Sequence, residues 1–133
     1  MKALLLLVGC MMLADAAPKG SIRADWVGVW QAELDGQPSA TLTLADDSGQ
    51  LGGTLVLDII SRDSGTAKVI AQEPHVLLHV RVDGKTLTFE ATRPDRSAMT
   101  FRVALGKDDT ANLHCVNCGD APVVELVKVT YGK

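Results

Sequence analysis

The chain has 133 residues, with 13 Lys and Arg against 16 Asp and Glu and a formal net charge of −3. The basic residues are spread along the sequence, so nothing predicts contact with a nucleic-acid backbone. No apolar run approaches the roughly 20 residues that a membrane-spanning helix needs, and no motif indicates a cofactor.

The N-terminus has the pattern of an export signal. Lys2 precedes an apolar run over residues 3–13, and small residues follow at 14–17. This pattern predicts a signal peptide over residues 1–16. The remainder, residues 17–133, has the length of a single domain with one core.

A second interpretation of the same segment is a lipid anchor. Residues 7–10 have the form of a bacterial lipobox, in which Cys10 would be lipidated and would become the mature N-terminus. Both interpretations place the domain outside the cytoplasm. It would be periplasmic or secreted in the first, and anchored to the cell envelope in the second.

Alternation of apolar and polar residues dominates from residue 26 onward, and no longer segment has the 3.6-residue period of an amphipathic helix. At most one helical turn is expected, at residues 23–26. Tight turns rich in Asp and Gly separate the alternating segments. The predicted strands lie at residues 26–34, 40–44, 51–60, 66–71, 75–82, 86–91, 98–105, 111–116 and 123–131.

Short strands at even spacing without crossover helices predict an all-β domain, a sequential antiparallel meander of about eight to nine strands. Closure into a single barrel is favoured because it removes exposed edges, and a β-sandwich is the alternative. In the first strand, period two places Trp26, Gly28, Trp30, Ala32 and Leu34 on the inward face.

The same alternation predicts the inward face of two further strands. In residues 51–60 the face in phase includes Leu55 and Ile59. In residues 75–82 the even positions share one face, Leu78 among them. The side chains on these faces are expected to contribute to the barrel interior.

The first strand carries a family resemblance. Gly28-Val29-Trp30 is a G-x-W motif, and it resembles the opening strand of lipocalins and other calycins. The resemblance implies that Trp30 closes one end of the barrel beneath a basic residue of the last strand. Lys128 is the basic residue inside that strand, where the family more often has Arg.

A longer resemblance covers the first half of the domain better than the second. Residues 28–38, with 41–44 and 51–54, look like a group of small exported bacterial proteins of unassigned function. This resemblance agrees with a barrel. It implies no substrate and no catalytic residue, because fold and function are separable.

The cysteines predict a local disulfide. Cys10 leaves with the signal in the first interpretation, and Cys115 and Cys118 then remain as an even pair in an oxidising compartment. His114 adds a third zinc-ligand type, but a structural zinc site needs four ligands and no second half-site exists, so no metal is predicted. Metal binding and redox activity are the alternatives, although a catalytic C-x-x-C usually opens a helix.

The histidines are candidates for acid or base chemistry. His75 and His79 share a strand face in the predicted alternation, but four residues of extended chain separate their Cα atoms by about 13 Å, too far to chelate one metal unaided. Arg81 lies on the same predicted face as a candidate anion contact. An enzyme with a dispersed site would use His75, His79 or His114 as acid or base, but no nucleophile motif supports it.

The sequence therefore favours a non-enzymatic protein that binds a small apolar ligand inside a lipocalin-like barrel. An envelope structural or protein-interaction module with a filled barrel is the alternative, and an enzyme is the third hypothesis. Gly28, Trp30, Lys128, Cys115 and Cys118 are expected to have structural roles. The expected ligand contacts are Trp30, Leu55, Leu78, Phe89 and Phe101.

Overall fold

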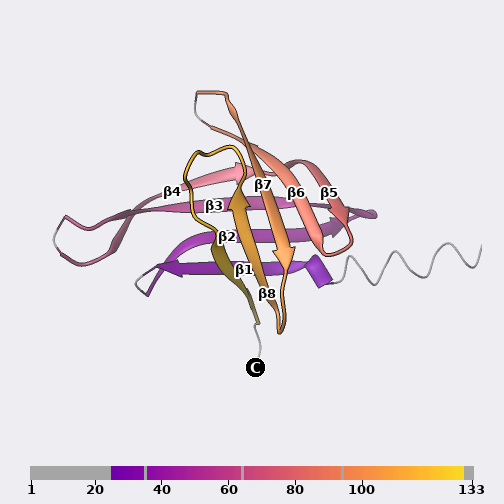
Figure 1. The fold of residues 1–133 in the computed structure, drawn as a ribbon, viewed down its shortest axis with the longest axis horizontal. Coiled ribbons are helices and arrows are strands. Elements are labelled where there is room, and N and C mark those ends of the chain that lie inside the picture. Colours follow the sequence, from indigo (N-terminus) through magenta and orange to yellow (C-terminus); the bar gives the residue numbers. More distant parts are fainter. Residues whose placement is uncertain (1–24, 35, 64, 94, 131–133) are drawn as a thin grey trace, which may run out of the picture.

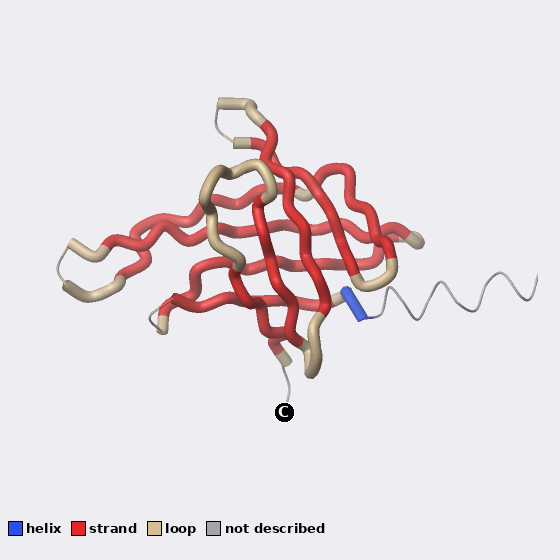
Figure 2. The backbone as a smooth tube through the Cα atoms, viewed as in Figure 1, coloured by secondary structure: helices blue, strands red, loops and turns tan. Residues whose placement is uncertain are grey.

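The computed structural model describes residues 25–34, 36–63, 65–93 and 95–130, and these are mostly strand (Figure 2). Within them, helical geometry is confined to Asp25 and Trp26. The rest of the expected turn, residues 23–24, lies outside the described residues. The strands are β1 (Gly28–Leu34), β2 (Gln37–Asp47), β3 (Gln50–Ser61), β4 (Lys68–Val76), β5 (Leu78–Asp83), β6 (Thr86–Thr92), β7 (Ala98–Leu105), β8 (Thr110–Cys115) and β9 (Val124–Val129).

All nine strands belong to one sheet, in the order β4-β3-β2-β1-β9-β8-β7-β6-β5. Every neighbouring pair is antiparallel, and pairing of β1 with β9 joins the first and last strands in the middle of the sheet. The sheet curls into a half-barrel in which β6, β7 and β8 cross in front of β1, β2 and β3 (Figure 1). The predicted all-β antiparallel meander is therefore confirmed.

The two edge strands, β4 and β5, are consecutive in the chain and are separated only by Leu77. The Leu77 N–H donates to the Gly53 carbonyl oxygen at 3.1 Å, just before the chain moves across to pair with β6. His75 Nδ1 lies 3.0 Å from the Thr92 carbonyl oxygen and so links β4 to the end of β6. The carbonyl can only accept, so this ring nitrogen carries the proton.

The predicted single strand over residues 75–82 is wrong, because its first residues end β4 and its last residues form β5, which a bulge interrupts. Between Leu78 and Arg81 the register shifts, and His79 has a φ of 53°, in the left-handed region. One extra residue in a strand reverses the faces of all the residues that follow. Leu77 and Val80 therefore both face inward although they are three positions apart, and Leu78 is 42% exposed on the outside of the sheet.

The core lies on the concave face of the curl, where the two halves of the sheet meet. Trp30, Leu55 and Phe89 are at most 1% exposed, and the rings of Phe89 and Phe101 stack with centroids 5.2 Å apart. The other buried apolar residues are Trp26, Ala32, Ala40, Leu42, Leu44, Leu77, Leu87, Ala91, Met99, Val103, Ala111, Leu113, Cys115 and Leu126.

Two further residues predicted to point inward are exposed. Leu34 is 44% exposed after a register shift in β1, and Ile59 is 40% exposed. The pairing of β2 with β3 ends at Leu57, so the rest of β3 has only β4 beside it. This part of the β3–β4 hairpin extends beyond the body of the molecule (Figure 1). A side chain there has no opposite sheet to pack against.

The predicted signal peptide, the lipobox with Cys10 and the end of the last predicted strand at Tyr131 lie outside the described residues. In the part of the chain that is described, no helix has the length and apolar character to cross a membrane.

Gly53 is required by the close approach of two strands. Its φ is +154°, and a Cβ atom built on it would overlap the carbonyl oxygen of Thr43 in β2. The neighbouring Gly52 has no atom within 4 Å of such a Cβ. The two glycines of β3 therefore differ in what they tolerate, although they are adjacent in sequence.

We expect Gly53→Ala to lower the free energy of unfolding by about 3 kcal/mol, because the strained backbone costs on the order of 1–3 kcal/mol and the overlap adds to it. Urea unfolding followed by tryptophan fluorescence measures the change. Gly52→Ala is the matched control and should change stability by less than about 1 kcal/mol. Equal destabilisation by the two variants would contradict the close approach described for Gly53.

Candidate ligand-binding hollow

The G-x-W motif forms a polar and aromatic cluster at one end of the half-barrel. The Trp30 Nε1–H donates to the Trp26 carbonyl oxygen at 3.0 Å. The Lys128 ammonium lies 5.2 Å from the centroid of the Trp30 ring and donates to the Asp25 carbonyl oxygen at 3.2 Å. The expected position of Lys128 over Trp30 is therefore present in the structure.

Gly28 leaves room for the lysine stem. A Cβ atom at Gly28 would lie 2.8 Å from Lys128 Cε, and the φ of Gly28 is +143°. Lys128 buries its stem against the sheet while its ammonium reaches a carbonyl oxygen and the ring face. The motif glycine and the basic residue of the last strand are thus parts of one contact.

Four of the five expected ligand contacts are core residues. Trp30, Leu55, Phe89 and Phe101 are between 0% and 4% exposed, so they fill the centre of the half-barrel. Leu78 lies on the opposite, outer side of the sheet. The structure therefore brings the first four together in one core and does not bring Leu78 to them.

One of these residues, Phe101, lines a small cavity of about 200 Å³. Leu57, Leu113 and Val124 contribute apolar side chains, and Pro122 from the β8–β9 connection covers it. A volume of this size accepts little more than a small organic group, since drug-sized ligands occupy about 300–1,000 Å³.

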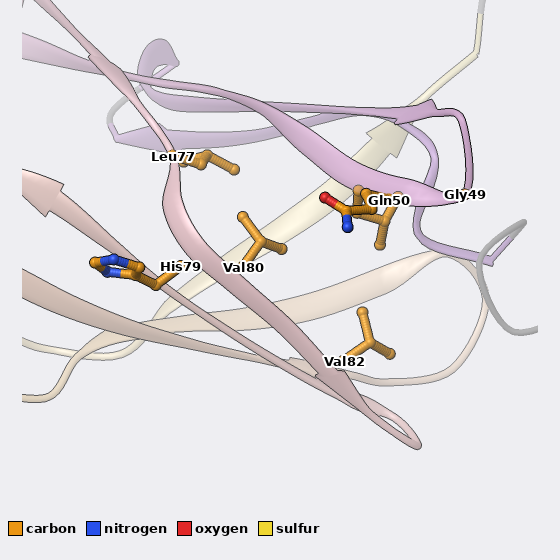
Figure 3. Close-up of a pocket in the computed structure, with 7 residues that line it drawn as sticks. Gly49, Gln50, Leu77, His79, Val80 and Val82 are labelled. Carbon is orange, nitrogen blue, oxygen red and sulfur yellow. The ribbon is translucent and has the colours of Figure 1, made fainter.

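A larger hollow of about 530 Å³ opens between the β2–β3 turn and β5, and we call it the seam hollow (Figure 3). Its apolar floor belongs to the edge of the core, because Leu77 is buried and Leu51, Val80 and Val82 pack against core residues. The complete lining is Gly49, Gln50, Leu51, Leu77, His79, Val80 and Val82.

Local structure places each side chain of the seam hollow. Asp46 Oδ1 accepts the Gly49 N–H at 3.0 Å, which holds the β2–β3 turn closed beside Gln50. The bulge in β5 turns Val80 and Val82 inward, while the His79 ring lies on the other side of the strand (Figure 3). Gln50 lies across the space from the two valines. The arrangement combines an aliphatic floor with a polar rim, and the rim supplies most of the exposed lining.

Sequence reasoning placed Val80 and Val82 on an inward face but missed Leu77 and the polar rim. Leu77 was expected on the face opposite Val80, because the alternation in residues 75–82 looks unbroken. The bulge places His79 in the left-handed region, which glycine adopts readily and other residues rarely adopt. A glycine at this position would have indicated the bulge in the sequence, and a histidine does not.

The expected disulfide between Cys115 and Cys118 is present, with Cα atoms 5.5 Å apart. It lies at the start of the connection between β8 and β9. Asn117 accepts the Thr100 N–H at 2.9 Å and donates to the Ala98 carbonyl oxygen at 3.0 Å. Within the described ranges, no three His, Cys, Asp or Glu side chains are arranged to hold a metal ion.

Arg93 connects the β6–β7 loop to this disulfide. It donates to Ser97 Oγ at 3.1 Å and to Cys118 Sγ at 3.5 Å. Ser97 in turn donates to the Asp95 carboxylate from its hydroxyl and its amide. These hydrogen bonds from Ser97 lower the pKa of Asp95 below its usual value, because they favour the charged carboxylate.

The three histidines lie on different strands with different neighbours. His75 contacts Thr92, His79 Nδ1 lies 3.1 Å from a carboxylate oxygen of Glu90, and His114 is paired in register with Arg102. They belong to β4, β5 and β8 respectively. They do not form one cluster, and only His79 lines the seam hollow.

Comparisons of the chain with protein-family models, with curated proteins and with solved structures give no match. The curled antiparallel sheet is compatible with a barrel fold. Assignment to the lipocalins specifically therefore has no support beyond the features of this chain.

We expect Lys128→Met to lower the free energy of unfolding by about 1–2 kcal/mol, because it keeps the packed stem and removes the cation over Trp30 and one hydrogen bond. Urea unfolding measures the change, and the emission of Trp30 reports the loss of the cation. Lys107→Met, at an exposed position in the β7–β8 turn, is the control for removal of one positive charge. An unchanged unfolding midpoint in Lys128→Met would show that the contact contributes nothing.

Proposed function

We propose that this protein is a non-enzymatic, exported binding protein of lipocalin-like design that holds a small apolar ligand, with the ligand seated in the seam hollow. The single observation that carries the proposal is the aliphatic floor of that hollow, which opens directly onto the core. Binding there buries apolar surface on both partners.

The size of the hollow fits a small ligand. Its volume of about 530 Å³ lies within the range of ordinary small-molecule sites. The centre of the half-barrel is filled by Trp30, Leu55 and Phe89, so a ligand is expected at the mouth and not in a deep calyx. Gln50 at the rim suits a polar head on an otherwise apolar molecule.

The open edges explain why the hollow lies where it does. No backbone pairing joins β4 to β5, so the side chains of the β2–β3 turn and of β5 face each other without a strand between them. A ligand placed there completes the packing of Leu51 on one side and of Val80 and Val82 on the other.

Two features support the proposal of export. The N-terminal pattern is that of a signal peptide, or of a lipobox at Cys10, and either one leads out of the cytoplasm. The Cys115–Cys118 disulfide is of the kind that forms and persists in oxidising compartments.

The envelope interaction module stays a second candidate because of one observation. The protruding β3–β4 hairpin exposes Ile59 and Ile70, which are 40% and 62% exposed, and β4 is an edge strand. Apolar residues on an edge hairpin are suited to contact with another protein. The ligand proposal is preferred because the seam hollow has both a defined volume and a floor continuous with the core.

The test uses N-phenyl-1-naphthylamine, an uncharged apolar probe whose fluorescence rises on leaving water. We expect saturable binding to the disulfide-bonded protein. Val82→Gln should weaken it about tenfold, because a polar amide placed at an apolar contact without a partner costs about 1–3 kcal/mol. Fluorescence titration gives both dissociation constants.

Val123→Gln is the matched control for this substitution, since Val123 is 59% exposed just before β9 and does not line the seam hollow. It should bind the probe as the unsubstituted protein does. Absence of saturable binding, or equal weakening in the two variants, would overturn the assignment of the hollow. The unfolding midpoints of both variants report any loss of fold separately.

A further inference from the structure

A row of polar residues crosses the outer face of the sheet, on the side opposite the core. The strand register pairs Arg81 of β5 with Thr88 of β6, Thr88 with Arg102 of β7, and Arg102 with His114 of β8. Residues paired in this way point to the same face. The four side chains therefore lie side by side, with Thr88 between the two arginines.

The outward direction of the row follows from its neighbours. Arg102 lies between buried Phe101 and Val103, and Arg81 lies between the inward-facing Val80 and Val82. Both arginines are exposed, and Thr88 and His114 are half-buried. Two strand spacings separate Arg81 from Arg102, about 10 Å between Cα atoms, so both long side chains can reach the space above Thr88.

The guanidinium groups of the two arginines are available to a ligand. Among the described residues, the side chains of Arg81 and Arg102 form no ion pair and no side-chain hydrogen bond. Glu90, the nearest carboxylate along β6, has an oxygen 3.1 Å from His79 Nδ1. Asp83 also borders the row but makes no ion pair with either arginine. Two guanidinium groups in a chain of net negative charge are thus left available.

The surface is hollowed on both sides of Thr88. One depression of about 410 Å³ is lined by Arg81, Asp83, Thr86, Thr88 and Arg102. A second, of about 420 Å³, shares Arg81 and Thr88 with the first and continues toward the His79–Glu90 pair. An oxyanion over Thr88 would lie about 5 Å from each arginine strand, well inside the screening length of roughly 8 Å at physiological ionic strength.

We propose that Arg81, Thr88 and Arg102 form a binding site for a doubly charged oxyanion, a phosphate or sulfate group. Each guanidinium presents two parallel N–H donors to a pair of anion oxygens, and the Thr88 hydroxyl donates a further hydrogen bond from between them. His114 extends the row and adds a donor on the β8 side. The site is independent of the seam hollow, because it uses the opposite face of β5.

The first experiment titrates inorganic phosphate into ¹⁵N-labelled protein at constant ionic strength and follows amide chemical shifts. We expect saturable shifts centred on Thr88 and Arg102, with a dissociation constant of about 1 mM or tighter. Shifts that grow linearly without saturation, or that are spread evenly over the lysines and arginines, would mean general ionic effects and would overturn the site.

Substitutions then identify the residues. Arg81→Gln and Arg102→Gln should each weaken phosphate binding about tenfold, and Thr88→Val about threefold. Arg102→Lys should fall between, because it keeps the charge and loses the paired donors. Lys68→Gln, which removes one charge at the start of β4 away from the row, is the control and should bind as the unsubstituted protein does. Equal weakening by the control would overturn the proposal.

A second arm separates the sources of the oxyanion. Phosphatidylcholine vesicles with and without phosphatidic acid are sedimented with the protein. Retention on the acidic vesicles that is lost in Arg102→Gln would assign the site to a lipid headgroup, and absence of retention beside saturable phosphate binding would assign it to a soluble molecule. Arg102→Gln should leave binding of N-phenyl-1-naphthylamine unchanged. Loss of phosphate binding and loss of probe binding are therefore measured independently of each other.

Discussion

The hydrogen bond from the Leu77 N–H to the Gly53 carbonyl oxygen fixes where the chain leaves one edge of the sheet for the other. Up to Val76 the chain is a strand beside β3, and from Leu78 it is a strand beside β6. Leu77, between them, enters the core. The approach of β3 to β2 at Gly53 leaves no room for a side chain, so this crossing point depends on a glycine. The two edge strands of the sheet, β4 and β5, meet the chain at this crossing point.

Much of the fold could be predicted from local rules. Turn residues and alternation identify the hairpins, since a buried face repeats every second residue. They place Trp30 and Leu55 in the core, and an even pair of cysteines predicts the disulfide. The family resemblance supplied the contact of Lys128 with Trp30, and the geometry agrees with it. These features depend on residues that are near in sequence or on a motif of three residues.

The missed features depend on tertiary context. Ile59 alternates correctly with its neighbours but lies beyond the last residue of β2 that pairs with β3, so burial fails there for lack of an opposite sheet. The bulge at His79 inserts one residue into an alternation that looks perfect, so the inward assignment of Val80 and Val82 holds and that of Leu78 before the bulge is wrong. The meeting of Leu77 with the two valines in the seam hollow was therefore not predicted, because the bulge lies between them.

β5 is the strand on which the two proposed sites meet. It has a hydrogen-bonded neighbour only on the β6 side, so its other side is held by the burial of Leu77 and by the packing of Val80 and Val82. The bulge that turns these valines toward the core also turns Arg81 outward, toward Thr88. A strand without the bulge that kept Leu77 in the core would turn Val80 and Val82 outward and Arg81 inward. One residue in the left-handed conformation thus creates an apolar surface on one face of the strand and a cationic surface on the other.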